Sequence, residues 1–219
     1  MYDAAHVSLY GATGCSPNAL HTGADIVITS THKLLGGPVG GLVLTQRTDL
    51  ARRLCQIPFP GLLQTRDQNK LAATAHSLCE MIEYGGAYAR QTISNARALA
   101  HALDGEGFDV FAKARGATAT HQVFVNVGEM GARPVEERCQ AAHILLHAAH
   151  MAGDSARGSR TGLRITVQEM TRRGMKEGEM DAIADLIARA AYAKHADDLK
   201  ADVALLAGAF PSIHYSFDD

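Results

Sequence analysis

The chain has 219 residues, of which 47% are hydrophobic and 20% are charged, and its formal net charge is -2 at pH 7. This composition supports one full domain or a large lobe with a small one, and it excludes a disordered chain and a basic nucleic-acid-binding surface. No apolar run approaches the roughly 20 residues that span a bilayer, and no signal-peptide pattern opens the chain, so we expect a cytoplasmic protein without a membrane or nucleic-acid partner.

A strand, a polar cluster, a turn and a second strand are predicted between residues 24 and 45. The β-branched run 26–28 leads into the polar cluster 29–33, and two glycine pairs around Pro38 precede another apolar run. Polar chemistry gathers where such buried strands end. Lys33 lies just past a strand end, where its amine can form a Schiff base with an aldehyde such as pyridoxal phosphate. A solvated loop lysine is the alternative.

The rest of the chain is predicted to alternate helices and strands. Prolines favour an extended or turn conformation at residues 58–61. Apolar periodicity over residues 67–103, interrupted by Gly85-Gly86, predicts one helix broken at the glycines, or two helices. Further strands are predicted at 108–111, 121–127 and 161–167, and further helices at 134–150, around 180–190 and through Leu205-Leu206. The four cysteines show no C-x-x-C spacing and are interpreted as reduced thiols.

Three histidines fall on the predicted helix 134–150. His143, His147 and His150 follow a four-then-three spacing, which can place two imidazoles on one metal ion. Glu136 shares that face, so we interpret the histidines as solvated residues near the carboxyl end of the helix, where positive charge is favourable. No third acidic or thiol ligand is evident nearby, and we predict no metal site.

The segment Asp3-Ala-Ala-His6, followed at a distance by Thr31-His32-Lys33 and by Gly37-Pro-Val-Gly-Gly41, resembles the cofactor segment of the serine hydroxymethyltransferase family of fold-type I pyridoxal phosphate enzymes. Phe59-Pro-Gly61 is similar to the family's Phe-Pro-Gly-Gly loop, and residues 161–175 are similar to its Ser-Gly-Ile-Arg and Thr-x-Arg-Gly-Phe segments. The similarity covers about residues 1–190.

The resemblance implies an α/β fold in two domains. Residues 1–103 would form the carboxy-terminal portion of a fold-type I large domain, aspartate aminotransferase-like, with a long connecting helix. Residues 104–219 would form the small α/β carboxy-terminal domain.

The resemblance also implies a role for each matching residue. Lys33 would be catalytic and would hold pyridoxal 5'-phosphate covalently, and Asp3 would pair with the pyridine nitrogen. His6 would be catalytic and would contact the cofactor's phenolic oxygen or the substrate hydroxyl. Arg164 would bind the substrate α-carboxylate, because a planar guanidinium offers two parallel donors. The other cofactor-binding positions would be Ser30, Thr31 and His32, whose side chains could donate to the cofactor phosphate, and Gly61.

Several residues depart from the family pattern. Val39 stands where the family has arginine, and residues 62–67 replace a loop that, in the family, offers amides to the cofactor phosphate of the neighbouring subunit. Residues 167–171 replace Thr-Pro-Ala-x-Thr. These changes speak against tetrahydrofolate as a second cofactor, and they leave room for a threonine transaldolase or a 2-methylserine-type enzyme.

A long amino-terminal portion precedes Asp-x-Ala-His in the family, whereas Asp3 is third here. We therefore expect a truncated chain, a natural fragment or half of a split enzyme, which assembles as a homodimer or as a heteromer with an amino-terminal-half subunit. The strand at Ile26 is expected to expose an unpaired, apolar edge. Alone, the chain is expected to bind pyridoxal phosphate weakly or to be poorly soluble.

The leading functional hypothesis is a serine hydroxymethyltransferase-like protein that performs aldol or retro-aldol transfer of a one-carbon or aldehyde unit. The bond concerned would be Cα–Cβ of a β-hydroxy amino acid of the glycine, serine and threonine class. A threonine transaldolase or aldolase is the alternative among enzymes. A non-catalytic fragment, pseudoenzyme or split subunit that needs a partner is the alternative of another class, so the sequence leaves open whether the chain is an enzyme.

Overall fold

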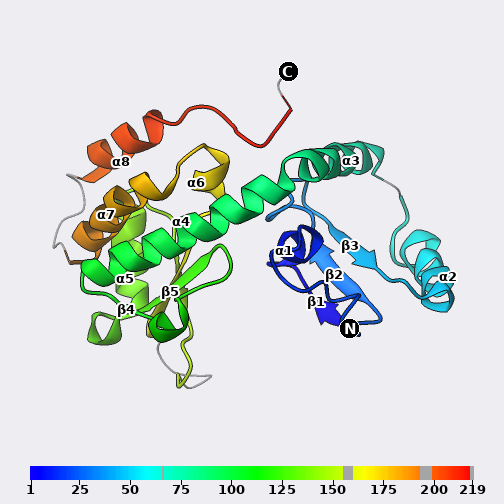
Figure 1. Cartoon of the computed structure of the whole chain (residues 1–219), viewed down its shortest axis with the longest axis horizontal. Coiled ribbons are helices and arrows are strands. Elements are labelled where there is room, and N and C mark those ends of the chain that lie inside the picture. The colour runs from blue at the N-terminus through cyan, green and yellow to red at the C-terminus, as the bar shows by residue number, and fades with distance from the viewer. Residues whose placement is uncertain (66, 155–159, 193–198, 218–219) are drawn as a thin grey trace. The chain divides into compact units, whose positions relative to one another are not determined.

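Two β-sheets organise the computed structural model of this protein, which describes residues 1–65, 67–154, 160–192 and 199–217 (Figure 1). The chain divides into two compact units, each built around one sheet. Unit 1 comprises Met1–Arg90 with the tail from Tyr215, and unit 2 comprises Gln91–His214. The domain boundary predicted between residues 103 and 104 falls inside a helix, α4 (Gly85–Gly105). The division into domains 1–103 and 104–219 stays a prediction.

The sheet of unit 1 has the strand order β1-β2-β3, so that β2 is central. β1 (Tyr2–Asp3) pairs in parallel with β2 (Val27–Ser30), and β3 (Gly41–Leu44) pairs with β2 in the antiparallel sense. The unpaired edge predicted for the strand at Ile26 is therefore wrong. The short segment from Tyr2 to Ala4 pairs with this edge of β2, because the Tyr2 and Ala4 amides donate to the carbonyls of Ile26 and Ile28, both at 2.8 Å.

The helical region predicted over residues 67–103 consists of two helices, α3 (Gln68–Glu83) and α4, which meet at Tyr84. The apolar stripe of α3 faces solvent, since Leu71 is 65% exposed and Ile82 is 85% exposed. The opposite side carries the buried residues of the helix, Ser77, Glu80 and Met81. The remaining helical elements of unit 1 are α1 (Ser8–Ala12), α2 (Thr48–Gln56) and the turn η1 (Ile57–Leu62).

The tail of the chain covers the buried side of α3. The carboxylate of Glu80, which is 4% exposed, accepts hydrogen bonds from the Ser216 hydroxyl and from the Phe217 amide. The Phe217 ring also meets Tyr84 edge-on, with a centroid distance of 5.7 Å. Charge-assisted hydrogen bonds compensate the cost of burying Glu80.

The sheet of unit 2 is antiparallel throughout, with the strand order β4-β5-β7-β6. Alternate residues of its two central strands, such as Val125 and Leu163, enter a core shared with α4, α5 and α7, while Arg164 and Thr166 lie on the other face. The strands are β4 (Asp109–Val110), β5 (Gln122–Asn126), β6 (His147–Ala149) and β7 (Gly162–Thr166). The helical elements are η2 (Lys113–Arg115), η3 (Gly128–Met130), α5 (Ala132–Ala141), α6 (Gln168–Arg172), η4 (Glu177–Glu179), α7 (Met180–Tyr192) and α8 (Leu199–Gly208).

The helix predicted over residues 134–150 is wrong in its second half. α5 ends at Ala141, the chain turns through His143 with a positive φ of 64°, and His147 begins β6. The Ile144 amide donates to the Cys139 carbonyl at 2.8 Å and closes the helix end. His143, His147 and His150 therefore share no helical face. The described residues contain no group of three side chains suited to hold a metal ion, and none of the described helices is long and apolar enough to cross a membrane.

The thiol of Cys139 should be unreactive in the folded chain. Its side chain is buried in the core of unit 2, and burial raises its pKa to about 11, so almost no thiolate exists at neutral pH. Labelling with iodoacetamide, read by peptide mass spectrometry, is expected to modify the exposed Cys55 and Cys79 and to spare Cys139 until denaturant is added. Labelling of Cys139 at the same rate as Cys55 would contradict this packing.

Candidate functional site

Lys33 lies in the loop that joins β2 to β3, as the sequence predicts. Three hydrogen bonds close this loop: the Thr31 amide donates to Gly40 O at 3.1 Å, the Gly37 amide to Thr31 O at 2.8 Å, and the Thr31 hydroxyl to Pro38 O. Gly36 adopts a positive φ of 67°. The loop from residue 31 to residue 40 is thus tied to itself, which fixes the backbone that carries Lys33.

Gly37 has a steric reason to lack a side chain. A Cβ atom there would lie 3.2 Å from the Thr31 carbonyl oxygen and 3.2 Å from the Ser77 hydroxyl oxygen. Ser77 belongs to the buried side of α3. The small side chain of Ser77 therefore allows α3 to approach the loop of Lys33 closely.

The amine of Lys33 contacts the imidazole of His6. Lys33 Nζ lies 3.0 Å from His6 Nε2, and both side chains are half-buried. The backbone around His6 is held against β2, because the Ser30 hydroxyl donates to Ala5 O at 2.9 Å and the Thr29 hydroxyl contacts Ala4 O at 3.3 Å. The sequence motif Asp3-Ala-Ala-His6 and Lys33 are thus brought together from positions 27 residues apart.

Asp3 ends β1 directly beside Ile28 of β2. Its side chain is exposed, and its Oδ1 accepts a hydrogen bond from the Ala5 amide at 2.9 Å. His32 is exposed next to Lys33, and Gly61 lies outside this network, exposed in η1. The structure therefore groups Asp3, His6 and residues 30–33 at the end of β2.

The two hydroxyl groups proposed as phosphate ligands already donate to backbone carbonyls. Ser30 donates to Ala5 O, and Thr31, which is 3% exposed, donates to Pro38 O. Each hydroxyl has a single hydrogen, so neither has a second one to donate to an anion. Their observed contribution is to hold the loop and the Asp3-to-His6 segment in place, and their role as phosphate ligands stays a prediction.

Arg164 belongs to unit 2, on the sheet face opposite the helices. It stands in β7 directly across from Phe124 of β5 and His147 of β6. Its Nε atom is buried and has no hydrogen-bond partner in the structure. A buried guanidinium N–H without an acceptor is costly, and such groups are commonly satisfied by an anionic ligand. Arg164 therefore has a buried donor that an acceptor such as a carboxylate could satisfy.

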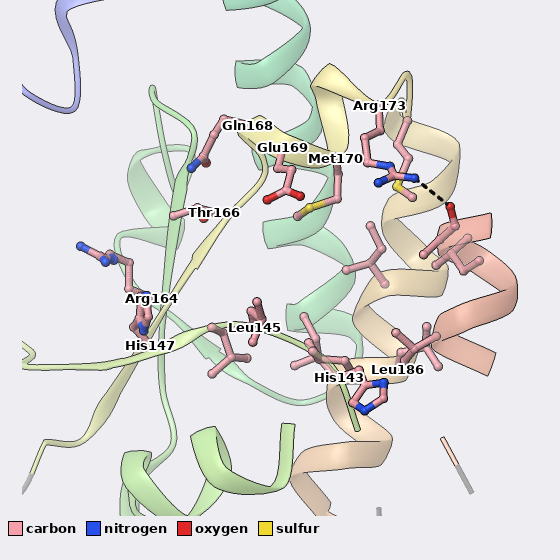
Figure 2. Close-up of a pocket in the computed structure, with 18 residues that line it drawn as sticks. His143, Leu145, His147, Arg164, Thr166, Gln168, Glu169, Met170, Arg173 and Leu186 are labelled. Atoms are coloured by element: carbon pink, nitrogen blue, oxygen red, sulfur yellow. Dashed lines mark hydrogen bonds between the residues drawn. The ribbon is translucent and has the colours of Figure 1, made fainter. Parts of the chain in front are cut away.

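Arg164 borders two cavities. One, of about 370 Å³, is mostly apolar and is lined from α6, α7, α8 and the residues before β6. Figure 2 shows Arg164 and His147 together at one side of this cavity, with the Arg164 guanidinium directed away from the apolar side chains. Arg173, on the other side, donates to Ala207 O at the end of α8, at 3.4 Å.

The second cavity, of about 430 Å³, is polar and is lined by Glu136, His147, Ala148, Ala149, His150, Arg160 and Arg164. Burial raises the pKa of the Glu136 carboxyl, but hydrogen bonds from Arg133, the Ala148 amide and His147 outweigh it and hold that pKa below its usual range. Glu136 is thus ionised and already paired. Arg160, which lies two residues before β7, was not predicted as a site residue, and no motif in the sequence marks it.

Comparison with known proteins gives concordant results. The family model described as serine hydroxymethyltransferase matches residues 1–187. Serine hydroxymethyltransferases of Methanothermobacter thermautotrophicus and Methanopyrus kandleri are 38% and 40% identical to the chain, over 100% and 99% of its length and over 52% and 51% of theirs. The chain thus spans about half the length of the curated relatives it matches. The crystal structure of L-threonine transaldolase from Pseudomonas fluorescens superimposes with a TM-score of 0.90 and 31% identity, covering 99% of this chain and 50% of that one.

Proposed function

Because the chain belongs to the serine hydroxymethyltransferase family, whose members depend on pyridoxal phosphate, we propose that it is the carboxy-terminal part of a hydroxymethyltransferase-like enzyme. The proposed reaction makes or breaks the Cα–Cβ bond of a β-hydroxy amino acid of the glycine, serine and threonine class. The observation that carries the proposal is the contact of Lys33 Nζ with His6 Nε2 at the end of β2. It joins an amine nucleophile to a group that can accept or donate a proton.

The residues around Lys33 fit the cofactor in part. Lys33 offers a primary amine for covalent attachment, and the Asp3 carboxylate, exposed at the end of β1, is suited to pair with a protonated pyridine nitrogen. The bound cofactor supplies an electron sink for the charge that develops on Cα. The Ser30 and Thr31 hydroxyls are committed to backbone carbonyls, so the donors for the phosphate would be His32, backbone amides or residues that this sequence does not contain.

We propose a separate role in binding or proton transfer for each of these residues of the chain. Arg164 would hold the substrate α-carboxylate, a role supported by its buried Nε atom, which has no partner in the structure. His6 would move a proton between the Lys33 amine and the substrate hydroxyl, a role supported by the 3.0 Å contact. The closed loop 31–40 would keep the Lys33 amine beside the His6 imidazole.

The assembly is also part of the proposal. The chain spans about half the length of its relatives, and the assembly we propose is a homodimer or a heteromer with a subunit that carries the amino-terminal half. A non-catalytic subunit is the second candidate, favoured by the two phosphate-ligand hydroxyls that are already engaged. Among enzymes, the similarity to the structure of an L-threonine transaldolase keeps transaldolase or aldolase activity as the alternative to hydroxymethyl transfer. A cytoplasmic location stays a prediction.

Reductive trapping tests the proposal. The purified chain is incubated with pyridoxal phosphate, with and without a candidate amino-terminal-half protein, then reduced with borohydride, digested and mapped by mass spectrometry. The label is expected on Lys33, and more of it with the partner. The other lysines, Lys70, Lys113, Lys176, Lys194 and Lys200, serve as internal controls. Equal labelling of all six, even with the partner, would leave the non-catalytic subunit as the better account.

The substrate is identified by the product. Acetaldehyde released from threonine by the assembled protein would support transaldolase or aldolase chemistry. Folate-dependent turnover of serine would support the transferase instead.

A further inference from the structure

The polar cavity beside Arg164 contains a second guanidinium group that the proposed function leaves without a task. Arg160 Nη1 donates to Ala148 O at 3.1 Å. Ala148 is the neighbour of His147, and His147 stands directly across the sheet from Arg164. Opposed residues of antiparallel strands have Cβ atoms about 5 Å apart. Both arginines therefore converge on the same short stretch of β6.

A buried carboxylate holds the segments that carry His150 and Arg160 together. Asp154 Oδ2 accepts hydrogen bonds from the Met151 amide at 2.9 Å and from the Thr161 amide at 3.0 Å, and Oδ1 accepts from the Thr161 hydroxyl at 2.7 Å. These bonds, led by that of Met151, hold the pKa of Asp154 below its usual range. Met151 follows His150 in the chain and Thr161 follows Arg160. The cavity wall is thus fixed from both sides by one side chain.

The charges in the cavity do not cancel. Its lining includes two guanidinium groups and one carboxylate, and that carboxylate, Glu136, already accepts from Arg133 at 2.8 Å and contacts His147 Nδ1 at 3.4 Å. The Asp154 carboxylate, beside the lining, is held by the Met151 and Thr161 amides and lies 3.9 Å from His150 Nδ1. Arg160 has one hydrogen bond to a carbonyl and no carboxylate partner among the ion pairs of the described residues. A guanidinium has five N–H donors, so most of those of Arg160 remain available for an anion.

We infer that this cavity is a two-anion site, in which Arg160, with His147 and His150, takes a second acidic group beside the carboxylate held by Arg164. The co-substrate or the amino acid that the site selects would thus carry an additional carboxylate or phosphate. The volume of about 430 Å³ falls in the range of small-molecule sites. The inference rests on the proposed function, in which Arg164 binds the amino-acid carboxylate.

Calorimetric titration of the full chain at low ionic strength tests the inference. Succinate carries two carboxylates, butyrate carries one on a chain of the same length, and 3-phosphonopropionate replaces one carboxylate of succinate by a phosphonate. Succinate is expected to bind at least tenfold more tightly than butyrate, because a hydrogen bond between charged groups is worth about a factor of ten or more. Whichever of succinate and 3-phosphonopropionate binds more tightly identifies the second acidic group as carboxylate or phosphate.

Variants separate the two anion positions. Arg160→Gln is expected to remove the advantage of succinate and to leave butyrate unchanged, while Arg160→Lys, which keeps the charge, retains part of it. Arg189→Gln is the matched control, because Arg189 is exposed on α7 and pairs with Asp185 and Asp202. Equal affinities for succinate and butyrate, or an advantage that survives both Arg160 variants, would overturn the inference.

The Arg164→Gln variant distinguishes failure of the proposed function from failure of this inference. Weaker binding of both ligands supports the role of Arg164. If butyrate binding is unchanged in Arg164→Gln, the proposed carboxylate role of Arg164 fails, while the Arg160 result still decides the second anion position.

Discussion

Replacement of Lys33 by alanine is expected to abolish covalent capture of pyridoxal phosphate, and to lower the activity of the assembled enzyme by about 10³-fold or more. Only a primary amine can attach the aldehyde, and Lys33 is the lysine that the loop 31–40 places 3.0 Å from His6. The measurement is the visible absorbance after addition of the cofactor, followed by borohydride reduction and peptide mass spectrometry.

Two control variants make the Lys33 result specific. Lys33→Arg keeps the positive charge beside His6 but removes the primary amine, so it is expected to behave like alanine in the trapping assay. Lys70→Ala removes an exposed lysine of α3 that pairs with Asp67 at 2.9 Å, and it should leave trapping unchanged. A visible band that persists in Lys33→Ala, with label on another lysine, would show that the loop of Lys33 is not the attachment site.

The loop around Lys33 could be predicted from the sequence because its signals are local. A β-branched run, a polar cluster and paired glycines lie within 20 residues and together indicate a strand, a turn and a strand, which the structure confirms. The pairing of β1 with β2 could not be predicted in this way. β1 has only two residues, too few to show any periodicity, and its pairing depends on backbone hydrogen bonds to residues about 25 positions away.

The predictions that were wrong concern features decided by tertiary contacts. Residues 134–150 have helical periodicity, but the amides of Ala142 and Ile144 close α5 early, and His147 gains strand hydrogen bonds to β7 instead. On α3, the apolar stripe was the natural choice for the buried face. The opposite side is buried because the loop of Lys33 requires a close approach at Ser77, and because the chain's tail supplies hydrogen bonds to Glu80.

The second large effect is expected for Asn95, a fully buried amide on α4. Its Nδ2 donates to Thr171 Oγ1 and to Met175 O, both at 2.9 Å, and its Oδ1 accepts from Gln91 Nε2 at 2.9 Å. Replacement by alanine leaves the Met175 carbonyl without that donor inside the core. We therefore expect Asn95→Ala to lower the free energy of unfolding of unit 2 by about 2–4 kcal/mol, because buried polar groups that lose their partner are costly.

Gln91→Ala is the matched comparison for Asn95→Ala. Gln91 is the partner at the partly exposed end of the same network, where it also donates to Glu177 at 2.9 Å, and water can replace its bonds, so its loss should cost about 1 kcal/mol or less. Urea denaturation followed by far-ultraviolet circular dichroism measures both variants. Equal destabilisation by the two substitutions would contradict the burial argument.

The position of the Asn95 network gives the same substitution a local consequence. Thr171 and Met175 bracket the end of α6, which directly follows the strand that carries Arg164. Hydrogen exchange in Asn95→Ala should therefore accelerate at residues 168–175, because these amides lose the anchor to α4. The loop of Lys33 belongs to the other compact unit, and its three closing hydrogen bonds involve residues 31–40 alone. Hydrogen exchange in the loop 31–40 should therefore stay unchanged. That result would show that the Asn95 network stabilises the region around Arg164 and not the loop that carries Lys33.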